Sequence, residues 1–179
     1  GAAADLAEEH PDWTGPQIKD ALMSTSKPID GGTYHVGAGR LDLASVTTDA
    51  ITATGSAYLG FFAWPHPDPQ PVSRTITYRN SGATARTLTL AADVAIGGGA
   101  YDVDPGADAG NPVPAGTFSL SATTVTVPAH GSASVTITAK PALAQEARRY
   151  VGQVVASDAS GVRARTQVAL YAEEERHDL

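Results

Sequence analysis

The side chains that could carry out chemistry are thinly spread along this sequence. Its five histidines are His10, His35, His66, His130 and His177. Each lies beside Pro, Gly, Tyr or a charged tail, and no two have the i, i+4 spacing with which a helix presents two metal ligands. We interpret them as solvated turn residues. We therefore predict no metal site, and the absence of cysteine also excludes thiol nucleophiles, disulfides and Cys-ligated metals.

A hydrolytic triad can be assembled on paper from His35, Asp42 and one of the serines. However, no serine lies in a G-x-S-x-G turn, which exposes the nucleophile in one class of hydrolases. Because any chain of this size contains chance combinations of His, Asp and Ser, we predict no catalytic residue. The glycine run at 97–99 is not followed by a helix start with Lys-Ser/Thr, so we predict neither a phosphate-binding loop nor a cofactor.

The loop at residues 101–111 is a candidate for calcium binding. Its carboxylates, which supply the hard oxygen ligands that calcium prefers, are Asp102, Asp104 and Asp108. An EF-hand needs Gly at the sixth loop position and Glu at the twelfth, but counting from Asp102 these positions hold Ala107 and Val113. We interpret the segment as a solvated loop and leave calcium binding there open.

Three aromatic residues, Phe61, Phe62 and Trp64, stand directly before a proline-rich segment, PHPDP. They could form an exposed platform for a sugar or a peptide. Alternatively, they fill a core at a corner between two domains. We favour the core, because aromatic residues make up only 6% of the chain and a core needs them.

The composition of the 179 residues favours a folded domain rich in strands over a disordered acidic tail, since 42% of them are apolar and 17% are charged. The 12 Lys and Arg stand against 19 Asp and Glu, so we expect no nucleic-acid partner. The longest apolar run, residues 58–64, is far shorter than the roughly 20 residues of a membrane-spanning helix, so we expect no membrane span. The first residues lack a basic or apolar leader, and we expect both ends to be cuts through a larger protein.

Residues 1 to about 48 have helical signals. The alanine-rich start forms a helix that Pro11 ends, because the residue before a proline avoids the helical region. Thr14 and Gln17 are spaced for a reciprocal capping box, and Pro16 suits the first turn of the second helix. Asp42 is placed to cap one last helical turn.

From Ile51 onward the apolar residues recur at every second position, which is typical of half-buried strands. In the segment 72–79, Val72, Ile76 and Tyr78 share one face. Another strand candidate starts at Ile51, and the remaining ones are 87–94, 118–127, 134–139, 150–156 and 162–171. Turn residues separate them and no helix intervenes. The sequence therefore predicts a mainly β fold, a seven-strand β-sandwich of the immunoglobulin or fibronectin-III type, preceded by a short helical segment.

Three motifs in the helical segment resemble the C-terminal end of a subtilisin-like serine protease domain. Residues 1–7 (GAAADLA) are similar to the stretch that starts at the last glycine of the family's nucleophile motif G-T-S-M-A-x-P-H-V-A-G, which opens a long buried helix. Residues 10–26 (HPDWTGPQIKDALMSTS) are similar to its H-P-x-[WL]-[ST]-x-x-Q-[IV]-[KR] run, and residues 37–42 (GAGRLD) to its closing strand. This resemblance covers a quarter of the chain and implies that residues 1–48 come from a truncated α/β subtilase domain.

The rest of the chain resembles the fibronectin-III-like domain that follows the catalytic domain in many large secreted subtilases. The similar pieces are residues 75–82 (TITYRNSG), 124–133 (TVTVPAHGSA) and 150–157 (YVGQVVAS). Each piece is common among bacterial sandwiches, but their order behind the helical segment matches these proteins. The implied division is a catalytic-domain remnant at 1–48 and an accessory sandwich at 49–179.

The resemblance implies a non-catalytic fragment of a secreted serine endopeptidase, because the family's catalytic Ser, His and Asp would all lie before Gly1. In that hydrolase the sandwich would brace the protease domain or present a peptide or protein substrate. Its partner would be the remainder of the protease domain. The alternative from a different class is a non-enzymatic extracellular adhesion module, a β-sandwich that binds carbohydrate or protein. A G-T-S-M-A motif before Gly1 would establish the first interpretation.

Overall fold

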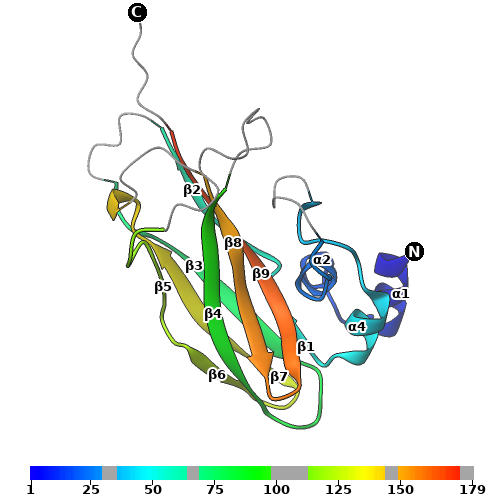
Figure 1. Ribbon diagram of the computed structural model, residues 1–179. Coiled ribbons are helices and arrows are strands. Elements are labelled where there is room, and N and C mark those ends of the chain that lie inside the picture. The colour runs from blue at the N-terminus through cyan, green and yellow to red at the C-terminus, as the bar shows by residue number, and fades with distance from the viewer. Residues whose placement is uncertain (30–35, 64–68, 98–112, 144–148, 174–179) are drawn as a thin grey trace, which may run out of the picture.

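The alternating pattern after Ile51 folds into two β-sheets packed face to face (Figure 1). The structure is a computed structural model that describes residues 1–29, 36–63, 69–97, 113–143 and 149–173. The four-stranded sheet has the order β1-β3-β7-β5, and the five-stranded sheet has the order β2-β9-β8-β4-β6. Strand bounds are β1 Ile51–Ala53, β2 Ser56–Phe62, β3 Val72–Asn80, β4 Arg86–Gly97, β5 Phe118–Leu120, β6 Thr124–Val127, β7 Gly131–Ala139, β8 Arg149–Asp158 and β9 Gly161–Ala172.

The prediction of a two-sheet sandwich is confirmed, but the described residues form nine strands where we predicted seven. Two predicted strands each cross from one sheet to the other. The segment from Ile51 pairs first with β3 as β1, and then runs parallel to β9 as β2. The segment 118–127 likewise joins β7 as β5 and β4 as β6. The alternation of apolar residues reports which face is buried and not which sheet a strand joins, so it could not reveal these crossings.

The core between the sheets consists of the inward-facing, alternate residues of the strands. Its largest fully buried members include Ile51, Leu59, Ile76, Tyr78, Leu88, Val127, Ile137, Tyr150, Val154, Val168 and Leu170. Val162, an apolar residue at the start of the predicted strand 162–171, stays outside the core, since it is 43% exposed. A register shift between Ala156 and Ser157 lies opposite this end of β9, and such a shift changes which side chains face the core.

The helical segment contains α1 (Ala2–Glu9), α2 (Gly15–Ser24) and α4 (Leu43–Thr48). The predicted capping box is present: the Thr14 side chain accepts from the Gln17 amide, and the Gln17 side chain accepts from the Thr14 amide at 2.7 Å. The buried apolar centre of this segment consists of Leu6, Ala21 and Val46. The α4 helix begins after Asp42, as predicted, although the Asp42 carboxylate accepts from the Ser45 hydroxyl instead of a backbone amide.

The helix α2 is attached to the sandwich where the chain crosses between the sheets (Figure 1). The Ser24 hydroxyl oxygen accepts from the Ala53 amide at 3.0 Å, and the Asp20 carboxylate accepts from the Gly55 amide at 2.9 Å. Gly55 is required by this close approach, since a Cβ atom there would lie 2.7 Å from the Cβ atom of Met23. These bonds satisfy backbone groups that leave the ladder at the crossing.

Candidate ligand-binding face

The outer face of the five-stranded sheet presents three rows of side chains that run across β4, β8, β9 and β2. Side chains alternate between the two faces of a strand, so the buried Tyr150 and Val154 leave Val151 and Gln153 on the outer face. The strand register places Asp93, Gln153 and Gln167 in one row. The next row is Ala95, Val151, Ala169 and Tyr58, and the third contains Arg149, Tyr171 and Phe61.

The row of Asp93, Gln153 and Gln167 is polar and open. The side chains of these residues have no hydrogen-bond partner within the part of the chain that the structure describes. The two glutamines are direct cross-strand partners, so their Cβ atoms stand about 5 Å apart. Each amide offers two donors and an acceptor. The row can therefore bind a ligand that also alternates donors and acceptors.

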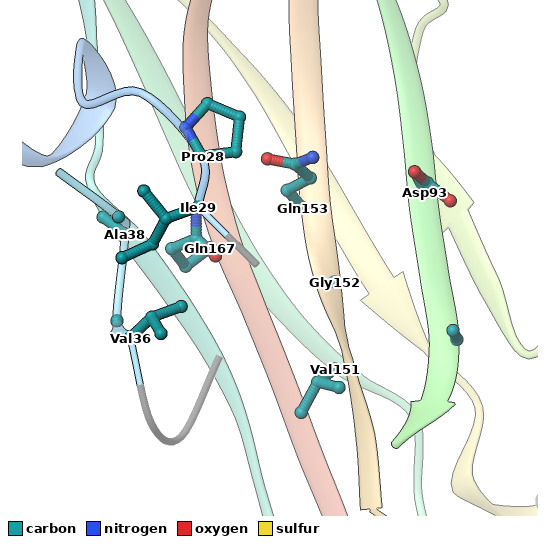
Figure 2. A pocket seen from close by; sticks show the side chains of 12 residues that line it. Pro28, Ile29, Val36, Ala38, Asp93, Val151, Gly152, Gln153 and Gln167 are labelled. Atoms are coloured by element: carbon teal, nitrogen blue, oxygen red, sulfur yellow. The ribbon is translucent and has the colours of Figure 1, made fainter. Parts of the chain in front are cut away.

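A wall formed by residues 28–29 and 36–39 stands over this row and encloses a groove of about 280 Å³ (Figure 2). We call it the outer-sheet groove. Pro28, Ile29, Val36 and Ala38 form its apolar side, and Figure 2 shows them facing the strands that bear Val151 and the polar row. The groove thus has an apolar wall and a polar floor, a combination typical of ligand sites.

The wall is fastened at its base by a short two-stranded bridge. Lys27 and Arg40 exchange backbone hydrogen bonds of 2.9 and 2.8 Å. Gly39 has φ +104°, and a Cβ atom there would lie 2.2 Å from the Lys27 carbonyl oxygen, so only glycine fits. The Lys27 ammonium lies 2.8 Å from the Asp42 carboxylate. The hydrogen bonds from Lys27 and Ser45 lower the pKa of Asp42 to about 2.

An aromatic cluster lies at one end of the same face, and we call it the aromatic corner: Tyr58, Phe61, Tyr171 and Arg149. Tyr58 and Phe61 are each 51% exposed. They share a face although they are three residues apart, because the register shifts between Tyr58 and Gly60 and Gly60 has φ +121°. The rings of Phe61 and Tyr171 lie 5.2 Å apart, and the Arg149 guanidinium lies 5.0 Å from the Tyr171 ring centre.

This arrangement divides the three aromatic residues that we expected in the core. Phe62 is half-buried and packs against the core, as expected. The expectation for Phe61 is wrong, since its side chain is on the outer face. The reason is the bulge at Gly60, which moves Phe61 to the face opposite to the one that simple alternation from Leu59 would give. Trp64 lies outside the described residues.

The other predicted site residues are not brought together. His10 stacks on Trp13 with ring centres 3.9 Å apart, and His130 occupies the turn before β7. Asp42, the acidic member of the triad considered from the sequence, forms an ion pair with Lys27 and accepts a hydrogen bond from the Ser45 hydroxyl. Its partner His35, the other two histidines and the loop 101–111 lie outside the described residues. Among the described residues, no three His, Cys, Asp or Glu side chains are grouped to hold a metal ion.

Sequence reasoning missed the row of Gln153 and Gln167. No motif marks either residue, and each is an ordinary outward position in an alternating strand. Only the register of β8 with β9 makes them neighbours. The sequence does contain two outward glutamines in consecutive predicted strands. It indicates that they are neighbours only once the register between the two strands is known.

No protein-family model and no curated protein sequence matches this chain. Among solved structures, it is similar to PapD-like domain 7 of human CEP192, with 15% identity over 84% of this chain and 94% of that one and a TM-score of 0.49. It is also similar to WR4, an MSP family member of C. elegans (10% identity, 69% and 98% covered, TM-score 0.33). A third is the CupB2 chaperone of Pseudomonas aeruginosa (18% identity, 68% and 54% covered, TM-score 0.34).

The expected membership of the subtilase family is wrong. The structures reported above are PapD-like, MSP and chaperone β-sandwich domains, and the chain matches no subtilase family model. The matched residues have local roles here: Thr14 and Gln17 cap a helix, and Gly39 makes a tight approach to Lys27. Such roles recur in unrelated proteins. The protease, peptidase and hydrolase functions and the protease-domain partner therefore have no support.

No helix among the described residues is long and apolar enough to cross a membrane.

Proposed function

We propose that the chain is a non-enzymatic, extracellular binding module that holds a protein partner by an extended peptide segment in the outer-sheet groove. The observation that supports this most is the pairing of an apolar wall with an unpartnered row of amides. A peptide in extended conformation presents both N–H and C=O groups, which the side chains of Gln153 and Gln167 can satisfy. Its apolar side chains would lie against Pro28 and Val36.

The lining of the groove supports binding over catalysis. Asp93 is the one ionisable residue among the described residues that line it. A covalent mechanism needs a nucleophile next to a base, and general acid–base catalysis of hydrolysis needs a second titratable group. The groove supplies neither, whereas the carboxylate of Asp93 can accept from a peptide N–H or pair with a cationic side chain of the partner.

Peptide selection from a library tests this function. A phage-displayed library of random twelve-residue peptides is selected on the whole chain, and the dissociation constants of the selected peptides are measured by fluorescence anisotropy. We expect Gln153→Ala and Gln167→Ala to weaken binding about five- to tenfold each, since each removes a hydrogen-bonding partner. Thr136→Ala, on the outer face of the four-stranded sheet, is the matched control and should leave binding unchanged.

Amide chemical-shift mapping with the selected peptide locates the site independently. Shifts should concentrate at Val36, Ala38, Val151 and Gln153. The proposal is refuted if the peptides bind the glutamine variants as tightly as the original chain, or if the shifts fall on the four-stranded sheet. Recovery of the full protein from the medium of its source cells, instead of from the cells, checks the extracellular location.

The aromatic corner favours a second candidate function, the binding of a neutral oligosaccharide. Half-exposed aromatic rings are costly to leave in water, and their faces pack well against the C–H bonds of sugar rings. Titration with cellohexaose is the test. Binding that is lost in Phe61→Ala but kept in Gln153→Ala would establish this function, and the absence of any heat or shift change with cellohexaose would exclude that ligand.

A further inference from the structure

A second groove lies on the other side of the helical segment, between the turn that joins α1 to α2 and the strands β1, β3 and β7. Its volume is about 520 Å³. We call it the helix–sheet groove. Its residues belong neither to the outer-sheet groove nor to the aromatic corner. The helix–sheet groove is therefore a separate site from the one proposed to bind a peptide.

Arg79 on β3 is the one arginine or lysine among the described residues that line this groove. The strand register places it between Thr52 of β1 and Ser132 of β7, so two hydroxyl groups flank it. Arg79 is half-buried and has no ion-pair or hydrogen-bond partner for its guanidinium within the described ranges. Arg163, which is similarly covered, instead contacts the carboxylates of Asp49 and Asp158.

A half-buried guanidinium without an acceptor has lost part of its hydration and gained nothing in exchange. Its planar array of donors fits a carboxylate, which can accept two parallel hydrogen bonds. The groove beside Arg79 is wide enough to admit such a group together with a ring that bears it.

The walls of the groove indicate what kind of molecule bears the carboxylate. The stacked rings of His10 and Trp13 form an aromatic wall on the helical side. His130 stands on the sheet side, in the left-handed backbone region at φ 47°. Asp12 lies at the exposed rim, where its charge would repel a second anionic group. A ligand with one carboxylate, several hydroxyl groups and a C–H face satisfies all of these features.

We infer that the helix–sheet groove binds an acidic sugar, a hexuronate unit of a glycan. The carboxylate of the sugar accepts from the Arg79 guanidinium. Its hydroxyl groups exchange hydrogen bonds with Thr52 and Ser132, and its ring packs against the wall of His10 and Trp13. A uronate is preferred over a dense polyanion because the described lining of the groove holds a single arginine and no lysine, together with the carboxylate of Asp12.

Titration with a hyaluronan tetrasaccharide, which contains glucuronate, tests this inference on the whole chain. The neutral control is cellotetraose. We expect the acidic tetrasaccharide to bind and to shift the amide signals of Trp13 and Ser132, while cellotetraose leaves these signals in place. Arg79→Gln should weaken binding tenfold or more, and Arg79→Lys should restore only part of the affinity, because lysine keeps the charge without the planar fork.

Two further variants keep the test decisive. Arg74→Gln, on the same strand but outside the groove, is the matched control and should bind as the original chain does. Ser132→Ala removes one flanking hydroxyl with little risk to the fold, and should weaken binding about threefold to tenfold. The inference is overturned if cellotetraose shifts the amide signals of Trp13 and Ser132 as strongly as the acidic tetrasaccharide does, if Arg79→Gln leaves the affinity for the acidic tetrasaccharide unchanged, or if a tripeptide with a free carboxylate displaces it from this groove as tightly as the sugar binds. None of these outcomes depends on the outer-sheet groove.

Discussion

The sandwich and the helical segment are stabilised in different ways. Between the sheets, large side chains such as Ile76, Leu88 and Tyr150 are buried and belong to one apolar cluster. In the helical segment the completely buried side chains are few, and Ala21 contributes almost no apolar area. This segment is instead attached to the sandwich by the hydrogen bonds that Asp20 and Ser24 accept.

The difference shows that the stability of the helical segment depends on the sandwich. Short helices in water are marginal without tertiary contacts, and the small cluster around Leu6 cannot compensate for the backbone entropy of α1, α2 and α4. The attachment at Gly55 therefore decides whether the segment is ordered. The segment in turn holds one wall of each groove, so any loss of attachment removes both candidate sites.

The largest expected effect is on the sandwich itself. Ile76→Asp places a carboxylate without a partner in the core, and we expect it to lower the free energy of unfolding by at least about 4 kcal/mol, or to prevent folding. Thermal unfolding followed by circular dichroism measures this. Ile76→Val is the matched control, with an expected loss of about 1 kcal/mol. Equal stability of both variants would show that Ile76 is not a core residue.

The next effect separates the two regions. Gly55→Val forces a side chain against Met23 and should detach α2, at a cost of about 2 kcal/mol. Native-state hydrogen exchange should show loss of protection at residues 18–23, with protection kept at 87–94. In the original chain, residues 18–23 should already exchange orders of magnitude faster than 87–94. Gly15→Ala, where a Cβ atom meets no other atom, is the control. Uniform loss of protection would mean that the two regions unfold as one.

A smaller effect concerns Tyr78, whose hydroxyl is buried and has no hydrogen-bond partner within the described part of the chain. Tyr78→Phe should raise the free energy of unfolding by about 1 kcal/mol, since it removes an unsatisfied polar group. Burial raises the pKa of the Tyr78 phenol, so the folded state keeps this proton after the unfolded state releases it near pH 10. Stability should therefore fall as the pH rises above about 10 in the original chain and fall less in the Phe variant. Denaturant titrations at pH 8 and 10.5 compare the two.

The smallest effect is local and concerns the base of the groove wall. The hydrogen bonds from Lys27 and Ser45 lower the pKa of Asp42 to about 2, below the value near 4 of an unfolded aspartate. The stability that this carboxylate contributes is therefore complete above about pH 4 and is lost as the pH falls toward 2. Exchange protection at the Lys27 and Arg40 amides should therefore decrease between pH 4.5 and pH 2.5. Asp42→Asn should show little change over that interval, and an equal decrease in both proteins would contradict the assignment.

Local features of the structure were predictable from the sequence. The capping box of Thr14 and Gln17 involves four consecutive residues, so its spacing is visible in the sequence. The inward face of β3 also follows from alternation alone, as Ile76 and Tyr78 show. Features that depend on partners far along the chain were not predictable. The crossing at Gly55 is one of these, because α2 and β1 together determine it.

The candidate sites belong to the second kind. Gln153 and Gln167 meet only because β8 and β9 pair in one particular register, and Arg79 is enclosed only because the turn after α1 covers it. The bulge at Gly60 could be suspected from a glycine inside an apolar strand. The subtilase resemblance was mistaken because it depended on helix caps and glycine turns. These are local features that proteins of different fold share.

The parallel pairing of β2 with β9 also affects the order in which the elements of the chain fold. Across the junction between them, the Thr166 hydroxyl donates to the Thr54 carbonyl over 112 sequence positions. Contacts between residues so far apart form late, because a long loop must first be closed. As the chain leaves the ribosome, α2 and β1 emerge long before β9 does. We therefore expect the first and last elements of the chain to become ordered together, in the final step of folding.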